Sequence, residues 1–79
     1  MGIRKAGLIS KEYTGNTTLP KQGNRSYFFI VMTQGTCTLE FGKGGGTIPL
    51  SEGNFYEPIV VPTSQIDVVS TGTYTIVTN

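Results

Sequence analysis

Hydrophobic and polar residues alternate in short runs along most of this chain. The cleanest run is residues 36–41 (TCTLEF), where Cys37, Leu39 and Phe41 alternate with polar residues. A period of two residues predicts a half-buried β-strand. Residues 27–32 (YFFIVM) are apolar at every position, which is typical of a strand that is central in a sandwich or covered by something else. No window has the 3.6-residue period of an amphipathic helix.

Turn residues separate these runs at short intervals. Gln34-Gly35 lies between the runs at 27–32 and 36–41, so these two runs are predicted to form a β-hairpin. Further strands are predicted at residues 47–50, 59–61, 65–69 and 73–78, with a Thr71-Gly72 turn before the last. Proline donates no ladder hydrogen bond, so Pro49 predicts an edge position for its strand.

The first third of the chain has fewer strand-like runs and more turn residues than the rest. Residues 14–26 are mostly turn and breaker residues and predict a loop or an extended arm, preceded by one edge strand within residues 7–13. We therefore divide the chain into an N-terminal arm and loop (1–26) and a β-domain (27–79). Short strands whose connections are too short for βαβ crossovers predict an all-β fold, a small antiparallel β-sandwich or a jelly-roll-like barrel.

The alternating positions also predict the core. Its expected members are Phe28, Ile30, Met32, Cys37, Leu39, Phe41, Phe55, Ile66, Val68, Tyr74 and Ile76. With 79 residues the chain makes one domain with a marginal core. One cysteine and no histidine exclude an intrachain disulfide and a zinc site. We therefore expect a partner subunit to supply stability, in a homo-oligomer for which a trimer is favoured.

Charge is low and unevenly distributed. The net charge is +1, but all six cations lie in residues 1–43, and residues 44–79 contain three acids and no cation. The bulk charge argues against nucleic acid as a partner. A solvated surface explains the asymmetry; the alternative is a basic segment that docks on an acidic neighbour. With no visible targeting signal and no apolar run long enough for a membrane, we expect a reduced chain made in a cytoplasm.

Residues suited to catalysis are few. Without histidine no Cys-His or Ser-His pair exists, and Cys37 lies on the predicted core face, so we expect an inert thiol. Glu52 and Glu57 flank one turn, which favours solvated side chains over a paired-carboxylate site. In the glycine-rich loop at 42–46 the lysine precedes the glycines and a strand follows, unlike a phosphate-binding loop, so it predicts a flexible hairpin loop or a close-approach loop at a subunit contact. We expect no enzyme, no cofactor and no metal.

The second half of the chain resembles a known group of proteins. Residues 44–58 (GGGTIPLSEGNFYEP), 61–64 (VPTS) and 72–77 (GTYTIV) are similar in layout to small structural proteins of tailed bacteriophages, in particular head decoration (cement) proteins. The resemblance covers residues 27–79 and includes a final hairpin. It implies a non-enzymatic virion protein that binds the outer capsid surface, with the major capsid protein as its partner.

Under this hypothesis the N-terminal segment makes the capsid or intersubunit contact. The residues assigned to it are Arg4, Lys5, Leu8, Ile9, Lys11 and Tyr13. The alternative is a small β-barrel ligand-binding module for a glycan or single-stranded nucleic acid, for example in a tail fibre or baseplate. Such a module would use exposed aromatic side chains such as Tyr13, Tyr27 or Tyr56, although half-buried packing also accounts for them.

Overall fold

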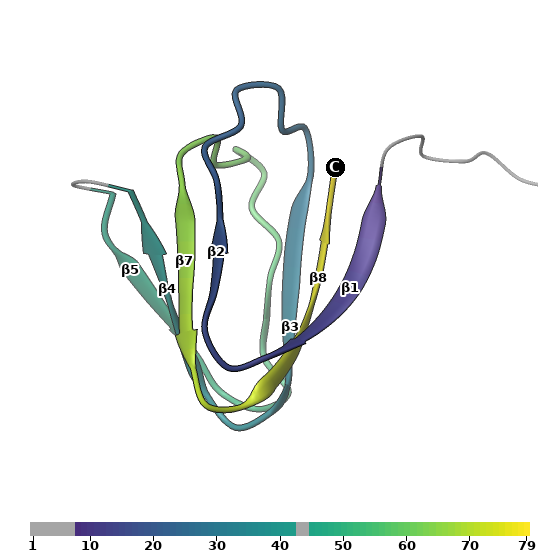
Figure 1. Ribbon diagram of the computed structural model, residues 1–79, viewed down its shortest axis with the longest axis vertical. Helices are drawn as coiled ribbons and strands as arrows, with labels where there is room; N and C mark the ends of the chain where they lie inside the picture. The colour runs from purple at the N-terminus through teal and green to yellow at the C-terminus, as the bar shows by residue number, and fades with distance from the viewer. Residues whose placement is uncertain (1–7, 43–44) are drawn as a thin grey trace, which may run out of the picture.

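The protein is described by a computed structural model in which residues 8–42 and 45–79 are defined. These residues form eight strands (Figure 1): β1 (Ile9–Thr14), β2 (Thr17–Leu19), β3 (Phe28–Gln34), β4 (Cys37–Phe41), β5 (Thr47–Leu50), β6 (Phe55–Tyr56), β7 (Ile66–Ser70) and β8 (Thr73–Thr78).

The strands pack as two four-stranded antiparallel sheets. Sheet A has the order β1-β8-β3-β6, and sheet B has the order β2-β7-β4-β5. The predicted all-β antiparallel sandwich is confirmed, and the described residues form no closed barrel. β3 lies between β8 and β6, as expected for a strand that is apolar on both faces, and Pro49 lies in β5, an edge strand.

The core lies between the inner faces of the sheets. In sheet A, Ile30 is opposite Ile76 and Met32 is opposite Tyr74, so all four side chains point inward. They are buried together with the inward residues of β4 and β7. The period-two pattern identified most of this core, because alternate residues of a strand share a face.

Two predicted core residues are placed differently. Phe55 is 61% exposed, because it pairs with Val31, whose side chain points to the outside of sheet A. Phe41 is half-buried at the margin of the core. Leu50 is buried although it was not predicted, since its register partner is the inward-facing Cys37.

The predicted hairpin of residues 27–41 is wrong. β3 pairs with β8 and β6 in sheet A, whereas β4 pairs with β5 and β7 in sheet B. The Gly35 turn therefore carries the chain from one sheet to the other. This arrangement lets the apolar faces of β3 and β4 cover each other across the core. A turn signal shows that the chain reverses, but not whether the next strand lies beside the first or across from it.

Three further expectations are corrected. The final hairpin is not formed, because β7 belongs to sheet B and β8 to sheet A. Residues 59–61 form no strand and are part of the β6–β7 connection. Residues 14–26, predicted as a loop or arm, include β2, which pairs with β7. The predicted edge strand near residues 7–13 is present as β1, and β4 and β5 form a hairpin around the glycine-rich loop.

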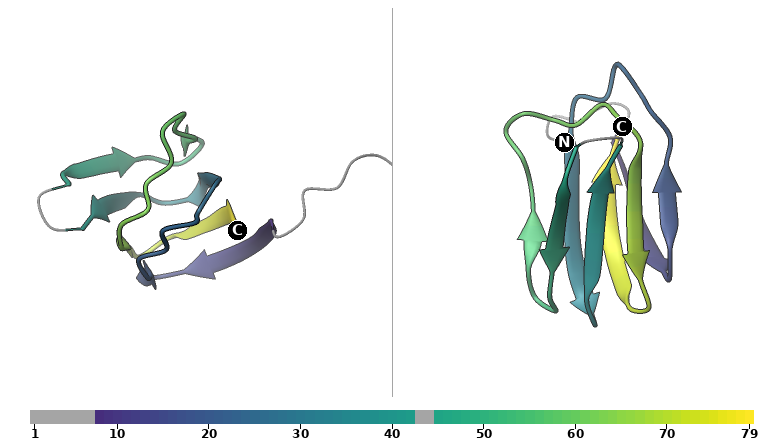
Figure 2. Two further views of the ribbon diagram at one scale, coloured as in Figure 1. Left: turned by 90° about the horizontal axis from the view of Figure 1, so that it is seen from above. Right: turned by 90° about the vertical axis from the view of Figure 1, so that its left-hand side faces the viewer.

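The connections gather at the two ends of the sandwich (Figures 1 and 2). At the lower end in Figure 1, the turns at 15–16, 35–36 and 71–72 meet, and the Gly15 amide donates to the Gly72 carbonyl at 3.1 Å. At the upper end, the loops at 20–27 and 57–65 meet, and the Gln22 amide donates to the Thr63 carbonyl at 2.9 Å. The loop at 57–65 contains Ile59 and Val60, the most exposed large apolar residues among those that the structure describes.

Candidate functional site

Four of the six predicted contact residues lie at the start of the described chain. Arg4 and Lys5 fall outside the described residues, and Leu8 is half-buried just before β1. Ile9, Lys11 and Tyr13 lie in β1 opposite Thr78, Ile76 and Tyr74, so they share the inner side of this edge strand. The structure therefore brings Ile9, Lys11 and Tyr13 onto one side of one strand.

Only Tyr13 of these three packs firmly. Its ring stacks on Tyr74 with centroids 5.8 Å apart, and the Lys11 ammonium lies 5.3 Å from the Tyr13 ring centroid. Ile9 is 64% exposed although it points to the inner side, because β1 diverges from β2 of the facing sheet toward this end (Figure 1). β1 is thus exposed on both faces along most of its length.

A second surface is the outside of sheet A. Phe29, Val31, Phe55 and Val77 point outward from neighbouring strands, and we call them the apolar outer patch. Phe29 and Phe55 have ring centroids 5.8 Å apart. Phe55 is exposed and the other three are half-buried. The patch is therefore contiguous and open to solvent.

The β6–β7 loop adds two aliphatic side chains to the exposed surface. Ile59 is 100% exposed and Val60 is 85% exposed. At the start of the loop, the Tyr27 hydroxyl donates to the Glu57 carboxylate, and this bond raises the pKa of Tyr27 above its ordinary 10.0. The far end of the loop is held through Arg25. Ile59 and Val60 therefore lie between two hydrogen-bonded positions of the loop, Glu57 at its start and the Arg25-bound carbonyls at its end.

Arg25 is a buried cation, only 5% exposed, that joins the two loops at this end of the sandwich. Its guanidinium donates to the carbonyls of Pro62 at 2.6 Å, Ser64 at 3.1 Å and Pro20 at 2.9 Å. Nε of Arg25 is buried without a partner among the described residues. Burial lowers the pKa of Arg25, but an arginine stays charged in proteins. The planar fork of arginine suits several carbonyls at once.

The outside of sheet B is polar. Glu40 and Asp67 are opposite each other in the β4–β7 ladder, a proximity that their separation in sequence concealed. Asp67 accepts a hydrogen bond from Thr18 at 2.8 Å and another from Gln65 at 3.2 Å. In the described part of the chain no three His, Cys, Asp or Glu side chains gather as metal ligands. The sandwich is thus two-sided, with an apolar patch on one sheet and a polar face on the other.

The residues considered for catalysis are not brought together. Cys37 is buried, and burial raises the pKa of its thiol. The Glu52 carboxylate accepts from the Gly35 amide at 3.4 Å, whereas Glu57 accepts from Tyr27. The two carboxylates of this turn therefore bind different parts of the chain.

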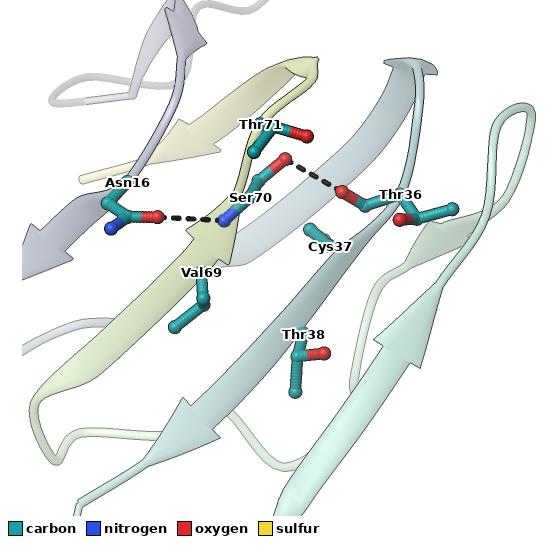
Figure 3. Close-up of a pocket in the computed structure, with 7 residues that line it drawn as sticks. All are labelled: Asn16, Thr36, Cys37, Thr38, Val69, Ser70 and Thr71. Carbon is teal, nitrogen blue, oxygen red and sulfur yellow. Dashed lines mark hydrogen bonds between the residues drawn. The ribbon is translucent and has the colours of Figure 1, made fainter.

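A groove on sheet B runs beside the buried thiol (Figure 3). The residues that line it are Asn16, Thr36, Cys37, Thr38, Val69, Ser70 and Thr71. The Ser70 hydroxyl donates to the Thr36 carbonyl at 2.8 Å, and the Asn16 side chain accepts from the Ser70 amide at 2.9 Å. These bonds tie the turns of this end together, so we assign the polar lining a structural role.

The three tyrosines of the ligand-binding alternative lie apart. Tyr13 is at one edge of sheet A, and Tyr56 is at the other edge, where it packs against Phe28 and Phe41. Tyr27 is engaged with Glu57. All three are half-buried, so they do not form one stacking surface.

Sequence reasoning missed Arg25 and the apolar outer patch. The uninterrupted apolar run at 27–32 was a signal for the patch, because one of its two faces had to lie outside the core. Nothing around Arg25 in the sequence marks it, since its partners are distant backbone carbonyls. No helix in the described ranges is long and apolar enough to span a membrane. No family model matches this chain, and no curated protein or solved structure matches it either.

Proposed function

We propose that this protein is a non-enzymatic structural protein that docks on another protein surface. The setting we propose is the head of a tailed bacteriophage, with the protein decorating the outer capsid surface in the virion and the major capsid protein as its partner. A homo-oligomer, with a trimer favoured, is part of this proposal. Neither nucleic acid nor a membrane is proposed as a partner.

The observation that supports the docking role is that Ile59 and Val60 are exposed in a loop whose two ends are held by hydrogen bonds. Soluble surfaces normally avoid contiguous exposed apolar side chains, and such residues mark interaction sites. Here both aliphatic side chains are at least 85% exposed, yet hydrogen bonds hold the loop at both ends, through Glu57 and through the carbonyls bound to Arg25. Preorganisation lowers the entropy that must be lost on binding. The virion setting is supported by the resemblance of residues 27–79 to decoration proteins.

The docking role is tested with a double variant, Ile59→Ser with Val60→Ser. Both side chains are exposed, so the fold is expected to be unaffected. Burying an aliphatic side chain contributes about 1.5–3 kcal/mol, so the double variant should bind at least about tenfold more weakly. Val69→Ser is the matched control, because Val69 is a partly exposed aliphatic residue on the polar face of sheet B.

The assay is co-sedimentation with heads of the phage that carries this gene, prepared without the protein. Wild type and Val69→Ser should sediment with the heads, and the double variant should stay in solution. Equal sedimentation of all three proteins would show that Ile59 and Val60 do not contribute to head binding. A gene found outside any phage or prophage genome would overturn the virion setting.

A further inference from the structure

The four edges of the two sheets are not equally open to a further strand. In sheet B, β5 has Pro49, which lacks an N–H, and β2 has three residues. In sheet A, β6 has two residues, whereas β1 has six. No strand of the described chain pairs with the outer side of β1, which borders the sandwich in Figure 1. β1 is therefore the one long edge among the described strands that is not blunted by proline or by shortness.

The register determines which backbone groups of β1 are free. The Gly15 amide donates to Gly72, which continues the β1–β8 register as a hydrogen-bonded pair. Antiparallel ladders alternate between hydrogen-bonded and non-hydrogen-bonded pairs. The odd-numbered residues of β1 are thus bonded to β8, and the N–H and C=O groups of Ser10, Glu12 and Thr14 point to the free edge.

The charges of β1 oppose pairing with a second copy. In both copies the backbone N–H and C=O groups on the outer edge belong to even-numbered residues. Two antiparallel copies of β1 can therefore hydrogen-bond only with even-numbered residues opposite even-numbered residues. The two longest registers then place Lys11 opposite Lys11 or Glu12 opposite Glu12. Like charges directly opposite each other are destabilising. Like charges therefore disfavour pairing of β1 with a second copy of itself, but they do not disfavour pairing with a strand that has a different charge pattern.

We propose that β1 accepts an extended strand from a different protein, added antiparallel to sheet A. This inference rests on the docking function proposed above and names its partner chemistry. The partner strand has an acidic residue opposite Lys11 and a basic residue opposite Glu12. It also has apolar residues opposite Ile9 and Tyr13, because these face the inner side, where Ile9 is 64% exposed. Main-chain hydrogen bonds supply affinity and alternate side chains supply specificity in such strand addition.

A synthetic capped peptide, Thr-Val-Lys-Glu-Thr-Val, has this pattern when read antiparallel to β1. It should shift the amide NMR signals of Ser10, Glu12 and Thr14 in the wild-type protein. A peptide with its two charges exchanged, Thr-Val-Glu-Lys-Thr-Val, places like charges opposite each other and should bind about tenfold more weakly or worse.

Two protein variants separate the backbone contribution from the charge contribution. Glu12→Pro removes a free-edge N–H without removing a bond to β8 and should abolish peptide binding, whereas Glu12→Ala keeps the N–H and should bind. The double exchange Lys11→Glu with Glu12→Lys should reverse the preference between the two peptides. Because both side chains are exposed, this exchange tests the proposal even if Glu12→Pro does not fold.

Equal binding of the two peptides, or signal changes centred outside β1, would overturn the proposal. So would a wild-type oligomer that Glu12→Pro converts to a smaller species, because the edge would then pair with its own copy. The outcomes stay distinct from those of the head assay: peptide binding at β1 is measured without heads, and head binding is tested through Ile59 and Val60.

Discussion

Gly35 and Gly72 pack against each other where two inter-sheet turns meet. A Cβ atom placed on Gly35 would lie 3.2 Å from the Gly72 Cα, and Gly35 has a φ of +82°. A Cβ atom on Gly72 would collide with the Gln34 carbonyl oxygen. These two glycines allow the chain to cross between the sheets twice at the same place.

We therefore expect Gly72→Ala to destabilise the fold. The backbone oxygen of Gln34 has to move, and overpacking of this kind costs about 1–3 kcal/mol. In a domain of this size each kcal/mol lowers Tm by about 4–8 °C. Gly23→Ala is the matched control, because no atom lies within 4 Å of its added Cβ. Thermal denaturation of both variants checks the prediction, and equal Tm values would refute close packing at Gly72.

Tyr74 links the core of sheet A to the β1–β2 turn. Its hydroxyl lies 2.6 Å from the Gly15 carbonyl and 2.7 Å from the Thr17 hydroxyl, and its ring is fully buried. Tyr74→Phe removes both bonds and leaves two part-buried oxygen atoms without this partner, so we expect a loss of about 1–3 kcal/mol in unfolding free energy. A double-mutant cycle with Thr17→Val should show coupling between the two sites. Additive effects in urea denaturation would contradict the hydroxyl pair.

Arg25 should not be replaceable by lysine. A single ammonium does not match three carbonyls from two loops, so Arg25→Lys should lose at least one hydrogen bond to a charged donor, about 1.5–3 kcal/mol. Amide hydrogen exchange should increase in residues 20–25 and 62–65. Lys21→Ala, an exposed change in the same loop, is the control and should stay within about 0.5 kcal/mol of wild type. Unchanged exchange in Arg25→Lys would show that the loops are held by other contacts.

Alkaline pH should weaken the fold through Cys37 and Tyr74. Burial raises the pKa of the Cys37 thiol above its ordinary 9.0 and that of the Tyr74 phenol above its ordinary 10.0. Unfolded chains then lose these protons at lower pH than folded ones, so the stabilisation is complete below about pH 8.5 and is lost as pH rises through the raised values. Unfolding free energies measured between pH 7 and 11 should therefore fall above pH 9.

The pH dependence can be assigned by substitution. Cys37→Ala should flatten the part of the curve near pH 9. Tyr74→Phe should reduce the fall near pH 10 and above, where the raised pKa of Tyr27 also contributes. In the folded wild type, the thiol should react with a disulfide reagent only as fast as the chain opens. Rapid labelling at neutral pH would contradict the burial of Cys37.

The predicted contact segment was only partly recognisable from the sequence. The edge strand was expected, and β1 is present. Alternation places Ile9, Lys11 and Tyr13 on one side of it, but only the register with β8 makes this the inner side. Arg4 and Lys5 lie outside the described residues. Because β1 and β2 belong to the two sheets, deletion of residues 1–26 would remove an edge strand from each, and the point substitutions proposed above are the cleaner test.

The sequence by itself determined most of the strands and most of their inner faces, although β2 was missed and residues 59–61 form no strand. Alternation is a property of neighbours along the chain, so it predicted that Ile30, Leu39 and Ile76 would be buried, and they are. Only the tertiary structure decided which strand lies beside which. The Gly35 and Gly72 turns signal a reversal equally well for a hairpin and for a crossing between sheets. Which strands pair depends on how apolar faces distant in sequence are buried against each other. The same arrangement buries Arg25, exposes Phe55 and leaves one edge of β1 unpaired among the described strands.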